Sequence, residues 1–145
     1  MWTAPAIGST DEYPDGTSAE DHKTDKNSSD SVNIGIERLM AGWLVLRLTS
    51  SHFPKERIIR LDPASHALSW SKGSKVEGAI HLERVTLITR GKKSLTLERA
   101  KGLDPKLCLS LHYSKTSLDM QCTSEAERDL MFHALSDLIG AKHHA

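Results

Sequence analysis

Residues 42–61, GWLVLRLTSSHFPKERIIRL, decide the fold. They contain two apolar runs, GWLVL and IIRL, and both are typical of short strands. Between these runs, residues 47–57 (RLTSSHFPKER) predict a hairpin loop with cations at its base and one aromatic residue, Phe53, near its tip. The rest of the chain is therefore interpreted as an extension of this basic hairpin.

Further short apolar segments follow the hairpin, and turn signals separate them. Asp62-Pro63 fits a turn with proline at its second position, and residues 71–78 predict a loop because they contain two glycines and two lysines. The predicted strands are residues 42–49, 56–62, 67–71, 79–82, 84–89, 107–113 and 117–122. Seven short strands indicate an all-β sandwich or barrel.

The last element has the 3.6-residue period of an amphipathic helix. Ser124 and Glu127 form a capping box at its start, and Gly140 suits its C-terminal cap. The predicted apolar stripe consists of Ala126, Leu130, Met131, Ala134, Leu135, Leu138 and Ile139. We expect this helix to cover one open end or face of the β structure. Residues 91–106 interrupt the strand rhythm and predict either a short helix or an additional β excursion.

The N-terminal region differs from the rest of the chain in charge. The net charge is zero, but residues 1–35 hold seven acids and two bases, whereas residues 36–145 hold twelve acids and seventeen bases. We expect residues 1–35 to be a disordered acidic tail, either regulatory or merely solvated. The domain is predicted at residues 36–141, with 142–145 frayed. Within its first residues, 34–40 predict a short helical turn or an extended segment.

Composition limits the classes of protein that remain. Alternation in the last two predicted strands places Cys108 and Cys122 on opposite faces, which predicts free thiols. No apolar run reaches 18 residues, so a soluble, cytoplasmic protein is expected. No catalytic motif, metal-ligand spacing or cofactor-binding loop is present, so we expect neither an enzyme nor a metal, cofactor or nucleic-acid binder.

Seven strands, a C-terminal helix and a basic loop between the first two strands resemble a pleckstrin homology (PH) domain, most like the phospholipase C delta type. The similarity covers about residues 38–140. It is carried by LRLTSSHFPKERIIRL, by Trp70 near the end of the third strand, and by Cys108-Leu109-Ser110-Leu111. Met131 stands where PH domains usually have tryptophan. The resemblance implies a seven-stranded barrel or sandwich capped by one helix.

The resemblance also implies a site for anionic lipid headgroups, such as phosphoinositides or phosphatidic acid. The implied headgroup-binding residues are Arg47, Lys55, Arg57, Lys72 and Lys75. Phe53 occupies the place of an aromatic residue that touches the bilayer, although it could instead pack on the barrel rim. The implied role is a non-catalytic, peripheral membrane-recruitment module in signalling.

Two departures from the resembled subgroup weaken this expectation. Thr49 and Pro54 stand where that subgroup has basic residues. Three interpretations of the cations remain: a specific bisphosphate pocket, weak binding to anionic membranes, or solvated hairpin charges. The cluster Arg90, Lys92 and Lys93 could form a second basic edge or a solvated loop.

An alternative from another class is a PH fold that has lost lipid binding and acts as a protein–protein scaffold at a membrane. Some PH-fold families have done this, including acylated proteins of the apicomplexan cortical membrane complex. Trp2 stands where myristoylation requires glycine, so such an anchor would lie outside this chain. The scaffold alternative predicts that acids such as Glu56 or Glu77 bind the cations, with an apolar patch exposed elsewhere.

Overall fold

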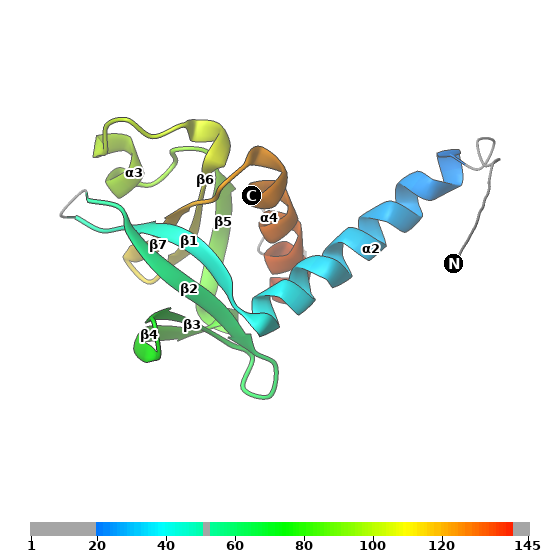
Figure 1. Cartoon of the computed structure of the whole chain (residues 1–145), viewed down its shortest axis with the longest axis horizontal. Helices are drawn as coiled ribbons and strands as arrows, with labels where there is room; N and C mark the ends of the chain where they lie inside the picture. Colours follow the sequence, from blue (N-terminus) through cyan, green and yellow to red (C-terminus); the bar gives the residue numbers. More distant parts are fainter. Residues whose placement is uncertain (1–19, 51–52, 141–145) are drawn as a thin grey trace, which may run out of the picture. The chain divides into compact units, whose positions relative to one another are not determined.

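Seven strands form one antiparallel sheet in the order β4-β3-β2-β1-β7-β6-β5 (Figure 1). The structure, a computed structural model, describes residues 20–50 and 53–140, with side chains described from residue 30 onward. The strands are β1 (Trp43–Leu48), β2 (Lys55–Asp62), β3 (Ala67–Lys72), β4 (Lys75–His81), β5 (Val85–Arg90), β6 (Cys108–Tyr113) and β7 (Thr116–Gln121). β1 pairs with both β2 and β7 and so joins the two halves of the sheet.

The helices complete the predicted architecture. They are α2 (Glu20–Ala41), η2 (Leu82–Arg84), α3 (Leu95–Arg99), η3 (Pro105–Leu107) and α4 (Glu125–Ile139). The Ser124 hydroxyl accepts a hydrogen bond from the Glu127 amide at the start of α4, as the capping box predicts. The fold class, a seven-stranded sheet with one C-terminal helix, is thus confirmed. Among the described residues, no helix combines the length and apolar content that a membrane span requires.

The inner face of the sheet forms the main core together with α4. Alternate residues of each strand point inward, as Trp43 and Val45 do in β1, and α4 contributes Met131 and Leu135. The predicted register of the last two strands is confirmed, because Leu109 pairs with Met120. That register separates the two thiols.

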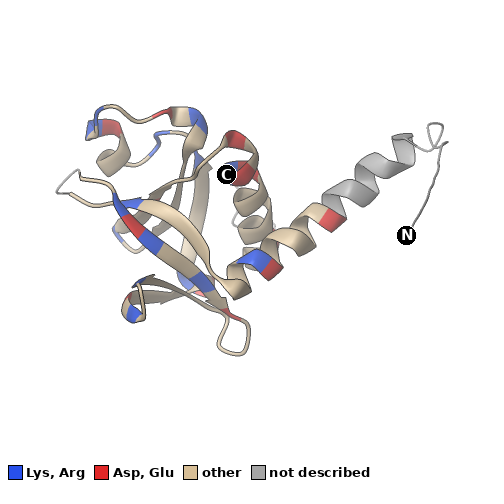
Figure 2. Cartoon of the chain, in the orientation of Figure 1, with Lys and Arg blue, Asp and Glu red and all other residues tan. Residues whose placement is uncertain are grey.

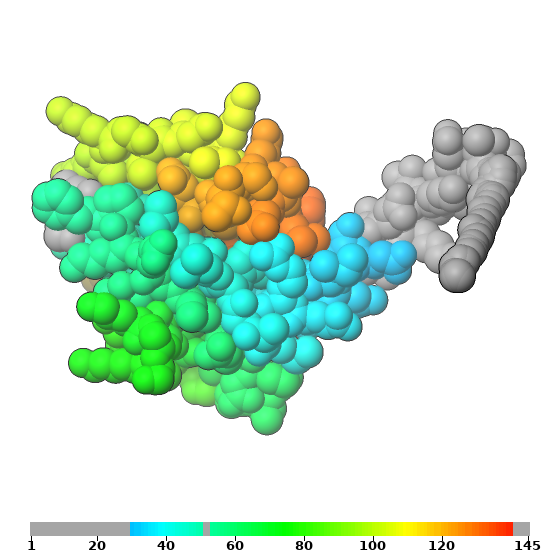
Figure 3. Space-filling model, in the orientation of Figure 1, coloured from blue at the N-terminus to red at the C-terminus, as the bar shows by residue number. Residues whose placement is uncertain are grey.

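A second, smaller core lies on the outer face and is covered by residues of the segment 91–106. Leu97 and Ala100 pack there against Leu48 and Cys108. Cys122, by contrast, belongs to the main core, so the predicted placement of the thiols on opposite faces is confirmed. In the space-filling view this yellow segment borders the strand β1–β2 surface (Figure 3). Segment 91–106 forms a short helix, the first of the two predicted alternatives.

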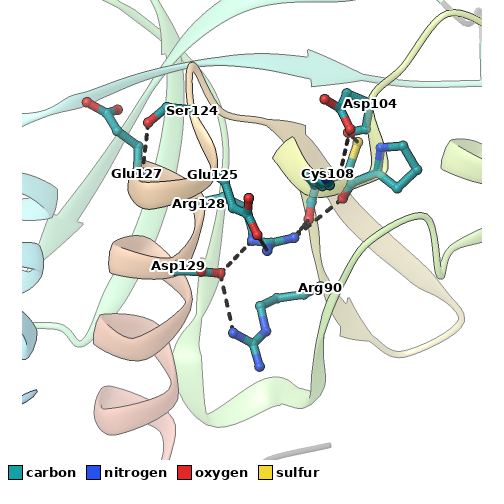
Figure 4. A network of polar contacts seen from close by, with 10 residues as sticks. Arg90, Asp104, Cys108, Ser124, Glu125, Glu127, Arg128 and Asp129 are labelled. Carbon is teal, nitrogen blue, oxygen red and sulfur yellow. Dashed lines mark hydrogen bonds and ion pairs between the residues drawn. The ribbon is translucent and has the colours of Figure 1, made fainter.

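Arg128 attaches the start of α4 to the sheet (Figure 4). Its Nε lies 2.7 Å from Asp129 Oδ1, and its Nη1 donates to the carbonyl oxygens of Pro105 and Cys108. Asp129 also accepts from Arg90 at the end of β5. A buried guanidinium is stable here because charged and carbonyl acceptors surround it.

Residues 20–35, predicted to be disordered, are helical in the structure, which corrects that part of the domain prediction. Packing explains the correction at the end of α2, because Leu39 is fully buried in the main core. Gly35 lies so near α4 that an added Cβ would be 2.7 Å from Ala134 Cβ. Residues 32–140 belong to one compact unit. The other residues of the predicted tail, 1–19, and the predicted frayed end lie outside the described residues.

A second correction concerns β4, which begins at Lys75 and not at residue 79. The predicted loop is reduced to a tight turn in which Lys72 pairs with Lys75. Gly73 makes this turn possible because its φ of +59° is a conformation that favours glycine. The strands of this hairpin therefore extend as far as Lys72 and Lys75.

Candidate functional site

The predicted headgroup residues gather where β1 ends and β2 begins. Arg47 pairs with Lys55, and both belong to the inward-facing alternation of their strands. Arg57 follows two residues later on β2, and Lys72 and Lys75 pair across the β3–β4 turn. In Figure 2, basic and acidic residues alternate along β2, and basic residues also mark the β3–β4 hairpin. We name these five cations the basic end.

Arg57 is held by a carboxylate and does not face open solvent. Its Nε donates to Glu77 Oε1 at 2.6 Å, and its Nη2 donates to Glu77 Oε2 at 3.2 Å. Its Nη1 donates to the backbone carbonyl of Glu56 at 2.7 Å. All three nitrogens of the guanidinium are therefore engaged, and the side chain is only 11% exposed.

Glu77 reaches Arg57 because of an irregularity in β4. The β3–β4 register shifts after the Trp70–Gly78 pair, so Glu77 is the residue that has no partner across the ladder. Such bulges redirect a side chain. The hydrogen bond from Arg57 lowers the pKa of Glu77, and the charges of Arg57, Arg47 and Lys72 lower it further. Glu77 thus remains charged and engages two nitrogens of the Arg57 guanidinium.

Arg47 is supported by an aromatic ring. Its guanidinium carbon lies 5.1 Å from the ring centroid of Trp70, a cation–π contact. Its Nε is buried without a hydrogen-bond partner among the described residues. Arg47 is therefore positioned beside Arg57 but retains an unused donor.

A small hollow of about 100 Å³ lies between these residues. It is lined by Arg47, Thr49, Lys55 and Arg57. Lys72 lines a neighbouring hollow together with Lys55 and Arg57. Lys75 is exposed at the turn and is not among the residues that line either hollow. The structure brings three predicted residues, Arg47, Lys55 and Arg57, around one hollow, but the volume of that hollow is small.

The remaining predicted features are exposed. The side chains of Lys55, Lys72 and Lys75 form no ion pair with another described residue. Phe53 is 71% exposed. Of the predicted second basic edge, Arg90 is bound to Asp129 and lies 4.2 Å from the Phe132 ring centroid, whereas Lys92 donates to the Ala100 carbonyl. Arg90 and Lys92 are therefore engaged in contacts within the fold.

The comparisons identify the fold. No protein-family model and no curated protein matches the chain. Among solved structures, inner membrane complex sub-compartment protein 1 of Toxoplasma gondii is 21% identical, with a TM-score of 0.63 over 88% of this chain and 96% of that one. The carboxyl-terminal PH domain of pleckstrin is 15% identical, with a TM-score of 0.51 over 68% of this chain and 95% of that one.

A phospholipase resemblance is also present but is one among several. PLC21 of S. officinalis is 16% identical, with a TM-score of 0.57, over 71% of this chain and 16% of that one. The chain therefore has the PH fold, as the sequence predicts. PH domains generally serve as binding modules for lipids or proteins.

Proposed function

We propose that this chain is a non-catalytic interaction module whose principal partners are proteins, and that it acts beside an anionic membrane. The observation that supports this proposal is the ion pair between Arg57 and Glu77. To bind a phosphate with Arg57, the site must first release Glu77. The charge-assisted hydrogen bonds that are given up then offset much of the gain from a headgroup.

Thr49 and Pro54 add to this proposal. Neither supplies the positive charge that the resembled subgroup has at these positions. A hollow of about 100 Å³ also leaves little room for an inositol ring. We therefore propose protein binding, in preference to specific headgroup recognition, as the function of this chain.

Weak, general attraction to anionic lipids is a second candidate, and a different observation favours it. Lys55, Lys72 and Lys75 are exposed at the end of the sheet that also presents Phe53. A cation near an anionic leaflet contributes about 1 kcal/mol. The name of the T. gondii neighbour refers to an inner membrane complex, and we extend a membrane-adjacent location to this chain as part of the proposal.

Calorimetric titration of the full chain with inositol 1,4,5-trisphosphate tests the absence of a specific pocket. We expect no saturable binding. In parallel sedimentation, vesicles with phosphatidylinositol 4,5-bisphosphate and vesicles of equal charge made with phosphatidylserine should bind the chain equally, and added salt should abolish both.

Two variants separate the possible outcomes. Arg57→Ala should leave vesicle binding nearly unchanged, as should the control Arg84→Ala, which removes an exposed arginine outside the basic end. Selective binding to the bisphosphate that Arg57→Ala removes and Arg84→Ala keeps would overturn the proposal in favour of a headgroup pocket.

A further inference from the structure

Two hollows meet on the outer face of the sheet, on the side of β1 opposite the main core. One, of about 510 Å³, is lined by residues that include Ile58 and Lys72. The other, of about 320 Å³, is lined by residues that include Gln121. Leu44 and Glu56 line both hollows, so the two hollows adjoin at these residues. We name the two hollows together the outer groove.

The floor of the outer groove is apolar. Leu44 is 50% exposed although it lies in the middle of the sheet, and its cross-strand partner Ile58 is half-buried. Further along the same face of β1, Leu48 is covered by Leu97 of α3. The chain itself thus covers one part of this apolar stripe with a leucine and leaves the adjoining part open.

One end of the groove presents hydrogen-bond acceptors. Leu46 pairs with Glu56 on one side and with Gln121 on the other, so the three residues form a row across β2, β1 and β7. The Glu56 carboxylate has no ion pair with a described residue, and Gln121 Oε1 is buried without a hydrogen-bond partner. Buried acceptors without partners are uncommon, and the last torsion of a glutamine rotates easily toward a ligand.

The other end of the groove is positive. Lys72, next to Ser71 on β3, lines the larger hollow and is not ion-paired with a described residue. The hydroxyl of Ser71, in the same lining, is also buried without a partner. The outer groove is therefore bipolar, with an acceptor end, an apolar centre at Leu44 and a cationic end.

We infer that the outer groove binds an extended segment of a partner protein that carries a basic residue, an apolar residue and an acidic residue at alternate positions. Neighbouring strands are about 4.8 Å apart, so the backbones of Glu56 and Gln121 are about 10 Å apart across β1. A guanidinium, which donates from both of its edges, suits two acceptors on the strands that flank Leu46 on opposite sides. The apolar residue covers Leu44, and the acidic residue meets Lys72.

This inference rests on the proposed protein-binding function and is tested separately from it. The probe is the peptide acetyl-Arg-Ser-Leu-Ser-Glu-amide, titrated at millimolar concentration into the ¹⁵N-labelled full chain. Amide shifts should concentrate at Leu44, Leu46, Glu56 and Gln121. A peptide with Ser in place of Leu should bind at least about tenfold more weakly, because it buries no leucine side chain.

Variants assign the shifts to the outer groove. Leu44→Asp should abolish them, whereas Leu95→Asp should not, because Leu95 is an exposed leucine, at 61%, that lies outside the groove. Glu56→Lys should reverse the charge preference, so that acetyl-Glu-Ser-Leu-Ser-Glu-amide binds better than the original probe. This reversal also shows that the variant is folded.

Absence of shifts, shifts confined to the basic end, or equal binding by Leu44→Asp would each overturn the inference. These results would leave the titration with inositol 1,4,5-trisphosphate unaffected. Conversely, tight headgroup binding would overturn the proposed function while the peptide shifts stood on their own.

Discussion

Glu77 binds Arg57 through two contacts, with Oε1 2.6 Å from Nε and Oε2 3.2 Å from Nη2. The carboxylate therefore neutralises the Arg57 guanidinium at the basic end. Glu77→Gln removes this charge and leaves the side chain similar in size. We expect Glu77→Gln to bind inositol 1,4,5-trisphosphate saturably and at least about tenfold more tightly than the wild-type chain, for which no saturable binding is expected. Arg57 then becomes available to fork to a phosphate.

Isothermal titration measures the change, with Glu83→Gln as the control. Glu83 is an exposed glutamate of η2, and its substitution removes the same charge from a different part of the surface. An equal increase for both variants would mean that overall charge, and not the ion pair, controls binding. No increase for Glu77→Gln would mean that the basic end lacks the space for a headgroup.

Gly78 is required by the ring that supports Arg47. A methyl group on Gly78 would overlap the indole of Trp70, its cross-strand partner. We expect Gly78→Ala to lower the free energy of unfolding by about 1–3 kcal/mol, the usual cost of overpacking. Thermal unfolding measures this loss, and Ala79→Ser, at the exposed neighbouring position, should unfold at nearly the wild-type temperature.

Glu127 predicts an acid-sensitive contribution to stability. Burial raises its pKa, but hydrogen bonds from Arg38 and Trp43 outweigh this effect, so the net pKa is lowered from 4.5. A lowered pKa in the folded state stabilises the fold above the unfolded-state pKa, and this stabilisation is lost as the pH falls through the folded value. The melting-temperature difference between wild type and Glu127→Gln should therefore be largest near pH 7 and shrink below pH 4.5.

The exposed residue Glu98 supplies the control for this series. Its variant Glu98→Gln should show a small difference from wild type at every pH. A Glu127→Gln difference that stays constant between pH 7 and pH 3.5 would contradict the assignment, since it would come from packing and not from the charge.

Most of the fold is predictable because its determinants are local. Alternation sets the strands and the register of the last two, and the Ser124–Glu127 box sets the start of α4. Strand β1 is an exception, because both of its faces are apolar and its pattern does not show which residues are covered. Only the tertiary structure shows that segment 91–106 covers Leu48 and leaves Leu44 exposed.

The residues of the basic end were predictable, but the ion pair that holds Arg57 was not. A bulge in β4 directs Glu77 to Arg57, and the sequence contains no signal that places that bulge between residues 70 and 78. The first part of α2, residues 20–35, was not predicted as a helix because its charged composition is typical of disorder. At residues 32–41 the helix is stabilised by packing, which the composition does not show. The apolar residues among 34–40, which predict a short helical turn as one alternative, were the available hint.

The two thiols should be unreactive in the folded chain. Burial raises the pKa of Cys122 to about 12, and burial also raises the pKa of Cys108. Since the thiolate is the nucleophile, we expect neither to be alkylated by iodoacetamide at pH 8 within an hour, and both to react fully in denaturant. Mass spectrometry counts the adducts. Rapid modification of Cys122 in the folded chain would show that the end of β7 opens readily.

Leu39 tests whether the last turns of α2 belong to the domain. Its side chain is fully buried in the main core, whereas the next residue, Met40, is 39% exposed on the same helix. Leu39→Ala should lower the free energy of unfolding by about 2–5 kcal/mol, the usual cost of emptying a buried leucine site. Met40→Ala, the matched control, should cost much less because it removes little buried surface. Urea denaturation measures both. Equal and small losses would mean that the strands and α4 fold without the helix, so that the domain begins at β1 and not at the predicted residue 36. A large loss at Leu39 alone would mean that the last turns of α2 belong to the compact unit that begins at residue 32.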